Sequence, residues 1–179
     1  MCTRHEINQA LRDLMTKNPN IILLGQSIRD PYGGVMKCTR GLTKDFSDRI
    51  IDLPICESGS AGLAIGLAMR GYIPILEIMF SDFITLCYDQ LYNMLGKIYG
   101  MHQLNTKIII RTMQNDDKMY GPSHSQVMHA VIESLNEGKY PCPVSWIYTS
   151  KYKVYSKIIE EALEKANPLT VILERKELY

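Results

Sequence analysis

The sequence lacks the features that mark several classes of protein. It contains no run of about eighteen apolar residues, so no membrane-spanning helix is expected. Residues 1–15 carry charges throughout and lack the apolar core of a signal peptide, which favours a cytoplasmic location. The net charge is only +1, so neither a nucleic-acid partner nor a membrane partner is expected.

Cysteine pairs and common functional motifs are also missing. The five cysteines form no CxxC pair, and this pattern predicts neither a zinc site nor a disulfide framework. We expect reduced thiols that pack as small apolar side chains. The sequence has no GxGxxG, no Walker A motif and no GxSxG elbow. No metal site is predicted in this chain.

What the sequence does contain is an alternation of two apolar patterns. Its 179 residues, 46% of them apolar, suit one α/β domain, and we assign residues 1–179 to it. Short apolar runs predict buried strands, at 21–24, 73–79, 107–111, 143–149 and 169–173. Helical spacing occurs between them, at 7–15, 57–70, 83–98, from about 123, and at 152–163. The alternation predicts a mostly parallel sheet with helices on both faces.

Three segments carry further expectations. Residues 29–50 are polar and contain glycine, so they are predicted to form a long surface loop. The helix at 57–70 is rich in glycine and alanine, which suggests close approach to another backbone. The helix at 83–98 is apolar nearly all round, which is typical of a buried helix or of one that meets a partner chain.

Two side chains are candidates for chemistry, and each has a structural alternative. Glu57 is either a first-turn carboxylate that favours the helix dipole or a partly buried acid that exchanges a proton with a bound heterocycle. His124 is either a solvated residue after an N-cap at Ser123 or a loop histidine at the strand ends, where α/β sheets bind ligands. Taken alone, Phe83 is interpreted as core packing and Arg111 as a solvated charge at a strand end.

Several motifs follow one another in order along the whole chain. They are Tyr32-Gly33-Gly34-Val35 with Lys37 and Thr39-Arg40-Gly41-Leu42, Leu53-Pro54-Ile55-Cys56-Glu57-Ser58-Gly59, Ala61-Gly62-Leu63-Ala64-Ile65-Gly66, Glu77-Ile78-Met79-Phe80, Asp89-Gln90, His124-Ser125-Gln126, and Leu173-Glu174 with Glu177-Leu178-Tyr179. Together they resemble the β subunit of the thiamine-diphosphate-dependent first component of 2-oxo acid dehydrogenase complexes. The matching part of that family is its N-terminal pyrimidine-binding domain, a parallel sheet between helices.

The resemblance implies a role for each candidate residue. Glu57 corresponds to the family's glutamate that hydrogen-bonds a pyrimidine nitrogen of thiamine diphosphate. Phe83 corresponds to the aromatic residue that stacks on this ring, and Ile55 is a further candidate for cofactor binding. His124 corresponds to the histidine that faces the substrate, so Glu57 and His124 are the expected catalytic residues. The implied reaction decarboxylates a 2-oxo acid and transfers the resulting acyl or aldehyde unit.

The resemblance also implies a partner. The family's magnesium–diphosphate motif, GDG followed by an asparagine, is missing, so we expect an α-type subunit to hold the diphosphate and Mg2+. The expected assembly is a heterotetramer, and the family's C-terminal domain is expected to be absent. The helices at 57–70 and 83–98 are the predicted contact surfaces.

Departures from the family leave two alternatives open. The family's GED after the first strand is Gly25-Gln26-Ser27 here, which removes an acid near the cofactor, and residues 112–120 replace a glycine-rich segment. The region around Trp146 diverges, so the family's potassium site is not carried over. The chain could therefore be a non-catalytic assembly or regulatory subunit. A small-molecule-binding α/β module unrelated to thiamine is the other alternative.

Overall fold

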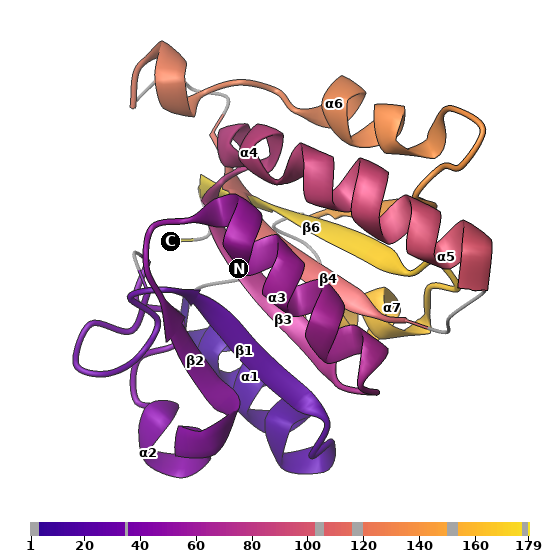
Figure 1. The fold of residues 1–179 in the computed structure, drawn as a ribbon. Coiled ribbons are helices and arrows are strands. Elements are labelled where there is room, and N and C mark those ends of the chain that lie inside the picture. Colours follow the sequence, from indigo (N-terminus) through magenta and orange to yellow (C-terminus); the bar gives the residue numbers. More distant parts are fainter. Residues whose placement is uncertain (1–3, 35, 103–105, 116–119, 150–153, 177–178) are drawn as a thin grey trace.

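The computed structural model describes residues 4–34, 36–102, 106–115, 120–149, 154–176 and 179. Its centre is a six-stranded sheet with the order β2-β1-β3-β4-β6-β5 (Figure 1). Every neighbouring pair of strands is parallel. The strands are β1 (Ile21–Gln26), β2 (Ile50–Leu53), β3 (Ile73–Phe80), β4 (Ile108–Gln114), β5 (Val144–Tyr148) and β6 (Leu169–Arg175). The predicted α/β class with a parallel sheet is confirmed.

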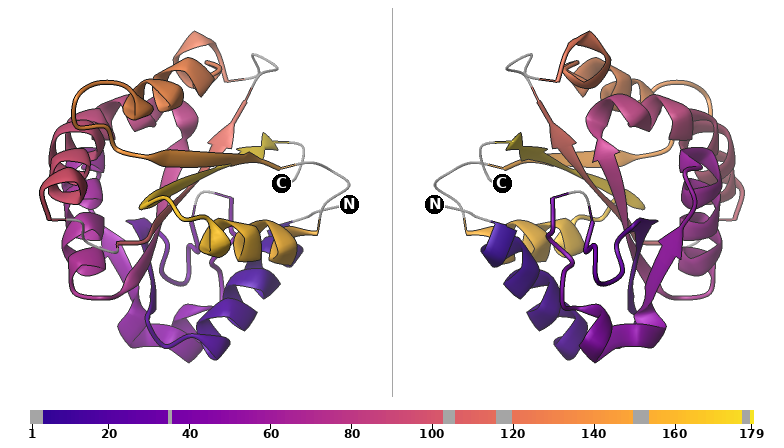
Figure 2. Two further views of the ribbon diagram at one scale, coloured as in Figure 1. Left: turned by 90° about the vertical axis from the view of Figure 1, so that its right-hand side faces the viewer. Right: turned by 90° about the vertical axis from the view of Figure 1, so that its left-hand side faces the viewer.

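One face of the sheet is covered by the first and last helices of the chain. Helix α1 (Arg4–Lys17) lies beside α7 (Tyr155–Glu164), and Figure 2 shows both on the same side of the strands. The buried side of α1 consists of Ile7, Ala10, Leu11, Leu14 and Met15, the residues that the helical spacing predicts. Burial of this apolar stripe against the sheet is what stabilises the helix here.

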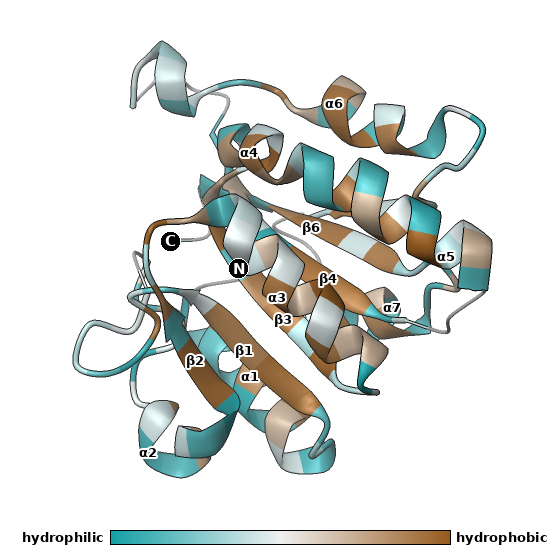
Figure 3. Cartoon of the chain, in the orientation of Figure 1, coloured by the Kyte–Doolittle hydropathy of each residue, from teal (hydrophilic) through white to brown (hydrophobic). Residues whose placement is uncertain are grey.

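The opposite face carries the helices from the middle of the chain. They are α3 (Glu57–Met69), α4 (Ile84–Asp89), the π-helical segment η3 (Gln90–Leu95), α5 (Gly96–His102) and α6 (His129–Glu133). Figure 3 shows that the strands are apolar along most of their length, whereas apolar and polar residues alternate along α4 and α5. Among the described ranges, no helix is long and apolar enough to cross a membrane.

The predicted surface loop at 29–50 is wrong in part. It contains the short helices α2 (Thr43–Phe46) and η1 (Ser47–Arg49), and it runs into β2, a strand that is not among the five predicted runs. Cys38, Thr39 and Leu42 are almost completely buried. Gly34 makes this inward path possible, because its φ of +77° favours glycine and a Cβ would lie 2.8 Å from Glu77 Oε1.

Two predicted helices differ in detail. The helix expected at 83–98 extends through Ile84–His102, with the wider π turns of η3 in its middle. The helix expected from about 123 is only a 3-10 turn, η4 (Pro122–His124), and α6 starts five residues after it. Ser123 is not an N-cap, because Gly121 occupies that position with a φ of +75°. The start of the last expected helix, residues 152–153, lies outside the described residues.

The glycines of α3 do not approach another backbone within the described chain. A Cβ on Gly59 or Gly62 would meet the side chains of Cys56 or Gln90, and Gly66 faces open space. Among the helical glycines a close backbone contact occurs instead at Gly96, where a Cβ would lie 3.0 Å from both Cys142 N and Tyr140 O. Within the described residues α3 therefore makes no such approach, and its contact with the backbone of a partner chain stays a prediction.

Three of the cysteines behave as small apolar side chains. Cys38, Cys87 and Cys142 are buried, and burial raises the pKa of each thiol to about 12. They therefore stay protonated and unreactive at neutral pH. Cys56 is exposed and departs from the expectation, and Cys2 lies outside the described residues.

Candidate functional site

Glu57 is the first residue of α3, just beyond the carboxyl end of β2. Its side chain is buried, with 8% of the residue exposed. Gln26, the last residue of β1, donates a hydrogen bond from Nε2 to Glu57 Oε1 at 2.9 Å. No hydrogen bond to Glu57 Oε2 is formed by any described residue, nor is this oxygen among those that the fold encloses completely. One acceptor atom of a buried acid is therefore left for a group from outside.

Phe83 and His124 meet in a cluster of aromatic rings. Their ring centroids lie 5.3 Å apart in an edge-to-face arrangement. Phe80, at the end of β3, contacts both, with centroid distances of 5.8 Å to Phe83 and 4.7 Å to His124. Tyr120 packs against Phe80 at 5.5 Å. The structure thus brings two of the predicted site residues together, although 41 positions separate them in the sequence.

The imidazole of His124 is held at one nitrogen. Its Nδ1 lies 2.8 Å from Ser123 Oγ, and either atom can be the donor. Among the described residues no partner binds Nε2. The ring is half-buried rather than solvated. A half-buried histidine with one open nitrogen can donate or accept a proton toward a bound molecule.

Glu57 is tied to the helix that follows Phe83. The thiol of Cys87, in α4, lies 3.4 Å from the backbone oxygen of Glu57. Helix α3 packs along α4, so the predicted acid and the aromatic cluster share one side of the sheet at the carboxyl ends of the strands. This is the position where open α/β sheets bind ligands. Ile55 precedes Glu57 and is 83% exposed, so its apolar side chain has no cover in this chain.

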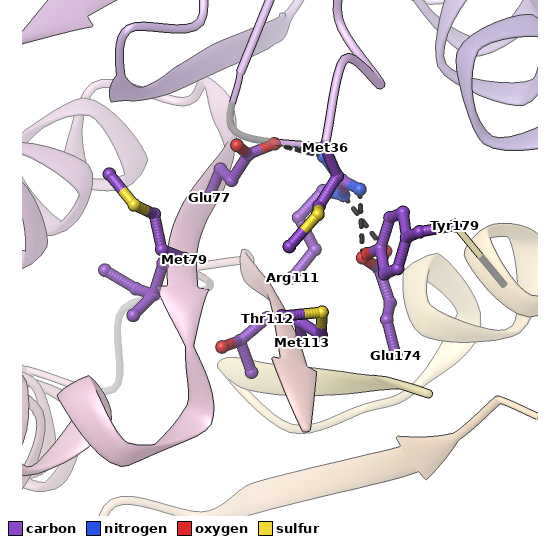
Figure 4. A pocket seen from close by; sticks show the side chains of 9 residues that line it. Met36, Glu77, Met79, Arg111, Thr112, Met113, Glu174 and Tyr179 are labelled. Carbon is purple, nitrogen blue, oxygen red and sulfur yellow. Dashed lines mark hydrogen bonds and ion pairs between the residues drawn. The ribbon is translucent and has the colours of Figure 1, made fainter. Parts of the chain in front are cut away.

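Arg111 forms a second charged centre on the opposite face of the sheet. It is 2% exposed and lies in the middle of β4, so the expectation of a solvated charge at a strand end is wrong. Its guanidinium binds both oxygens of Glu174, at 3.0 and 2.9 Å, and also contacts Glu77 (Figure 4). Tyr155 and Tyr179 donate hydrogen bonds to Glu174.

The electrostatics of this centre follow from burial and pairing. Burial raises the pKa of Glu77, and Arg111 opposes that shift only in part. Burial alone would lower the pKa of Arg111, but Glu174, Tyr155 and Glu77 hold it well above its ordinary value. A cavity of only about 10 Å³ borders Glu77, Arg111 and Glu174. This centre has room for about one water molecule and none for a cofactor.

With this geometry in view, the comparison with known families is decisive. The whole chain, residues 1–179, matches the pyrimidine-binding domain of transketolase. The chain belongs to that family. The pyrimidine-binding domain that the sequence motifs predict is thereby confirmed.

Curated relatives of this pyrimidine-binding domain are β subunits. One is the β subunit of acetoin:2,6-dichlorophenolindophenol oxidoreductase from Cupriavidus necator, 33% identical over 184 residues, which include 97% of this chain and 52% of the relative. Another is the chloroplastic pyruvate dehydrogenase E1 component subunit beta-3 from Oryza sativa, 31% identical over 176 residues, 97% of this chain and 43% of the relative. The chain therefore spans about half the length of the curated relatives it matches.

Solved structures show the same fold at lower identity. A split-gene transketolase described as an inactive beta4 tetramer matches 98% of this chain and 51% of its own, with a TM-score of 0.71 and 20% identity. Transketolase from Leishmania mexicana matches 97% of this chain and 25% of its own, with a TM-score of 0.70 and 19% identity. These two structures support the fold alone.

The structure also shows residues near the aromatic cluster that the sequence analysis missed. Phe80 and Tyr120 complete the cluster, and Asp82, Gln114 and Asn115 hold the chain that follows His124. Phe80 was visible only as part of a strand motif, and the polar residues carried no motif signal. Their common position at the carboxyl ends of β3 and β4, or just beyond them, is the one signal that could have found them.

Proposed function

We propose that this chain is the pyrimidine-binding β-type subunit of a thiamine-diphosphate-dependent enzyme. The family to which it belongs depends on this cofactor, and its β-subunit relatives act on pyruvate or acetoin by name. The observation that carries the proposal is Glu57, a buried acid with one oxygen left unbonded by the described residues. We propose a 2-oxo acid as the substrate and decarboxylation followed by acyl or aldehyde transfer as the reaction.

The residues present fit the pyrimidine half of the cofactor. Glu57 Oε2 can hydrogen-bond a ring nitrogen, since no described residue occupies it. Phe83 offers a half-buried aromatic ring, and the exposed side chain of Ile55 can cover an apolar edge. When bound, thiamine diphosphate supplies the electron sink for loss of carbon dioxide. The protein's part is to orient the ring, to hold a proton at Glu57 and to present His124 to the substrate.

We propose that an α-type partner chain holds the diphosphate and Mg2+, and that the assembly is a heterotetramer. The described residues contain no group of three His, Cys, Asp or Glu side chains suited to a metal. Leu63, Met69, Leu86, Met94 and Met101 are exposed apolar side chains on α3, α4, η3 and α5. Exposed apolar side chains on helices that pack against one another support an interface on this face. The cytoplasmic location predicted from the N-terminal sequence stays a prediction.

The test combines binding with a single substitution in the chain co-purified with its partner. Thiamine diphosphate with Mg2+ is titrated calorimetrically into the chain alone and into the complex, and we expect tight binding only in the complex. Glu57→Gln keeps the shape of the side chain but cannot hold the proton, so turnover of a 2-oxo acid should fall by about 100-fold or more. Unchanged turnover would show that the role assigned to Glu57 is wrong.

One observation favours the second candidate, a non-catalytic assembly subunit. Gln26 stands where the family has an acid, and it is the residue that contacts Glu57. An amide cannot exchange a proton with Glu57, so one route of proton transfer is missing. In this case Glu57→Gln would leave the complex unchanged, whereas Gly62→Leu on α3 would prevent assembly. Gln26→Glu in the same complex then tests whether the missing acid limits the rate.

A further inference from the structure

Residues 125–128, directly after His124, form neither helix nor strand. Backbone N–H groups in such a segment need partners other than a regular ladder. Three buried side chains supply contacts to this segment from the ends of β3 and β4. They are Asp82, Gln114 and Asn115, with exposed fractions of 8%, 1% and 1%.

The contacts of these side chains reach three of the four residues of the segment. Asn115 Nδ2 donates a hydrogen bond to Ser125 Oγ at 3.0 Å. Asp82 Oδ1 accepts one from the backbone N–H of Gln126 at 3.1 Å. Gln114 Oε1 accepts a longer one from the backbone N–H of Met128 at 3.4 Å. We call these three side chains the polar clamp.

Asp82 is the member of the polar clamp that connects it to the aromatic cluster. It directly precedes Phe83 in the 3-10 turn η2 (Ser81–Phe83). One turn of chain therefore sets the Phe83 ring against His124 and holds the backbone two residues after His124. A buried acceptor that is left without its hydrogen bond is costly, so Asp82 Oδ1 favours the conformation in which the N–H of Gln126 reaches it.

We propose that Asp82 is a positioning residue for His124. By accepting the N–H of Gln126, it fixes the segment after His124, so the imidazole stays against Phe83 and Phe80 and faces the site. The proposal rests on the proposed function, because only there does the position of His124 affect a reaction. Asp82 itself touches neither substrate nor cofactor in this assignment.

The chain offers a matched set of variants. Asp82→Ala removes the acceptor, and Asp82→Asn retains an oxygen that can accept the same hydrogen bond. Gln126→Pro removes the same bond from the donor side, at an exposed residue, and serves if Asp82→Ala does not fold. Asn136→Ala is the control, since Asn136 Oδ1 also accepts a backbone N–H, from Val144 at 3.0 Å, at the start of edge strand β5.

The first measurement is independent of activity. In the 179-residue chain, nuclear Overhauser contacts between the ring protons of His124 and Phe83 report the geometry directly. We expect these contacts in the wild type, in Asp82→Asn and in Asn136→Ala. They should be lost in Asp82→Ala and in Gln126→Pro. Their survival in a folded Asp82→Ala chain would overturn the proposal.

The second measurement is a double-mutant cycle with His124→Ala in the complete enzyme, using 2-oxo acid decarboxylation with a dye as electron acceptor. Asp82→Ala should lower kcat about tenfold in the wild-type background and less than about twofold in the His124→Ala background. Equal losses in both backgrounds would show that Asp82 does not act through His124. If His124→Ala alone leaves kcat unchanged, the proposed catalytic role of His124 is wrong. The nuclear Overhauser contacts then still test whether Asp82 positions the His124 ring.

Discussion

The acidic side chains on the two faces of the sheet differ in how many hydrogen-bond and ion-pair partners they have. On the face covered by α1 and α7, the carboxylates of Glu77 and Glu174 are both bound by Arg111. On the face covered by α3 and α4, Glu57 has one amide partner, and the described residues leave its second oxygen free. In the first arrangement the carboxylates are bound within the fold. In the second, Glu57 Oε2 remains available to a bound molecule. The difference separates an acid that serves structure from one that is suited to chemistry.

The largest expected effect comes from breaking the structural centre. Arg111→Met leaves the buried Glu174 and the half-buried Glu77 without their cation, so the free energy of unfolding should fall by about 3–5 kcal/mol. Urea denaturation followed by circular dichroism measures this loss. Lys157→Ala is the control, because its ion pair with Glu160 is exposed and screened by water, so its loss should leave the free energy of unfolding nearly unchanged. Equal effects of the two substitutions would contradict the view that the Arg111 centre holds the fold together.

A smaller and pH-dependent effect is expected at Glu77. Burial raises its pKa, so its contribution to stability is fully present below about pH 4.5 and is lost as the pH rises through the folded-state pKa. Glu77→Gln removes this ionisation and still offers an oxygen to Arg111. At neutral pH the substitution should therefore change the free energy of unfolding by at most about 1.5 kcal/mol.

The sign of the Glu77 effect is the informative part. The free energy of unfolding of Glu77→Gln, relative to that of the wild type, should rise as the pH increases from about 4.5. Denaturation curves for both proteins at several pH values between 4 and 8 measure the trend. A relative stability that falls with pH would mean that ionised Glu77 is favoured in the folded state, against this interpretation.

The smallest effect on stability is expected at Glu57. Glu57→Gln should change the free energy of unfolding by less than about 0.5 kcal/mol, because no ion pair is lost and the new amide oxygen can still accept from Gln26. The same variant is expected to lose most of its turnover in the complex. A loss of stability as large as that of Arg111→Met would place Glu57 with the structural acids instead.

The sequence predicts the alternation of the fold well and its charged interior poorly. Buried helix faces and apolar strands follow local periodicity, which is why the stripe of α1 and five of the six strands are visible. Strand β2 was missed because it is only four residues long and only one of its residues is fully buried. Arg111 was misjudged because its partners Glu77 and Glu174 lie 34 and 63 positions away.

The candidate site shows the same limit. Local chemistry identifies Glu57 and His124 as open questions, and only the resemblance assigns roles to them, which stay predictions. Two features depend on the carboxyl ends of the neighbouring strands β3 and β4. They are the contact between Phe83 and His124 and the polar clamp. No local pattern encodes such contacts, since they arise from strand order and register.

The pairing of α1 with α7 has a consequence for the order of folding. Helix α1 is synthesised well before its neighbour α7, which starts about 150 residues later in the sequence. In contrast, α3 and α4 meet soon after each is made. We therefore expect the helices on the face that carries Glu57 to pack before α1 and α7 pack on the face that carries Arg111. Until then the nascent N-terminal helix exposes Ile7, Leu11 and Met15, a surface suited to chaperone capture.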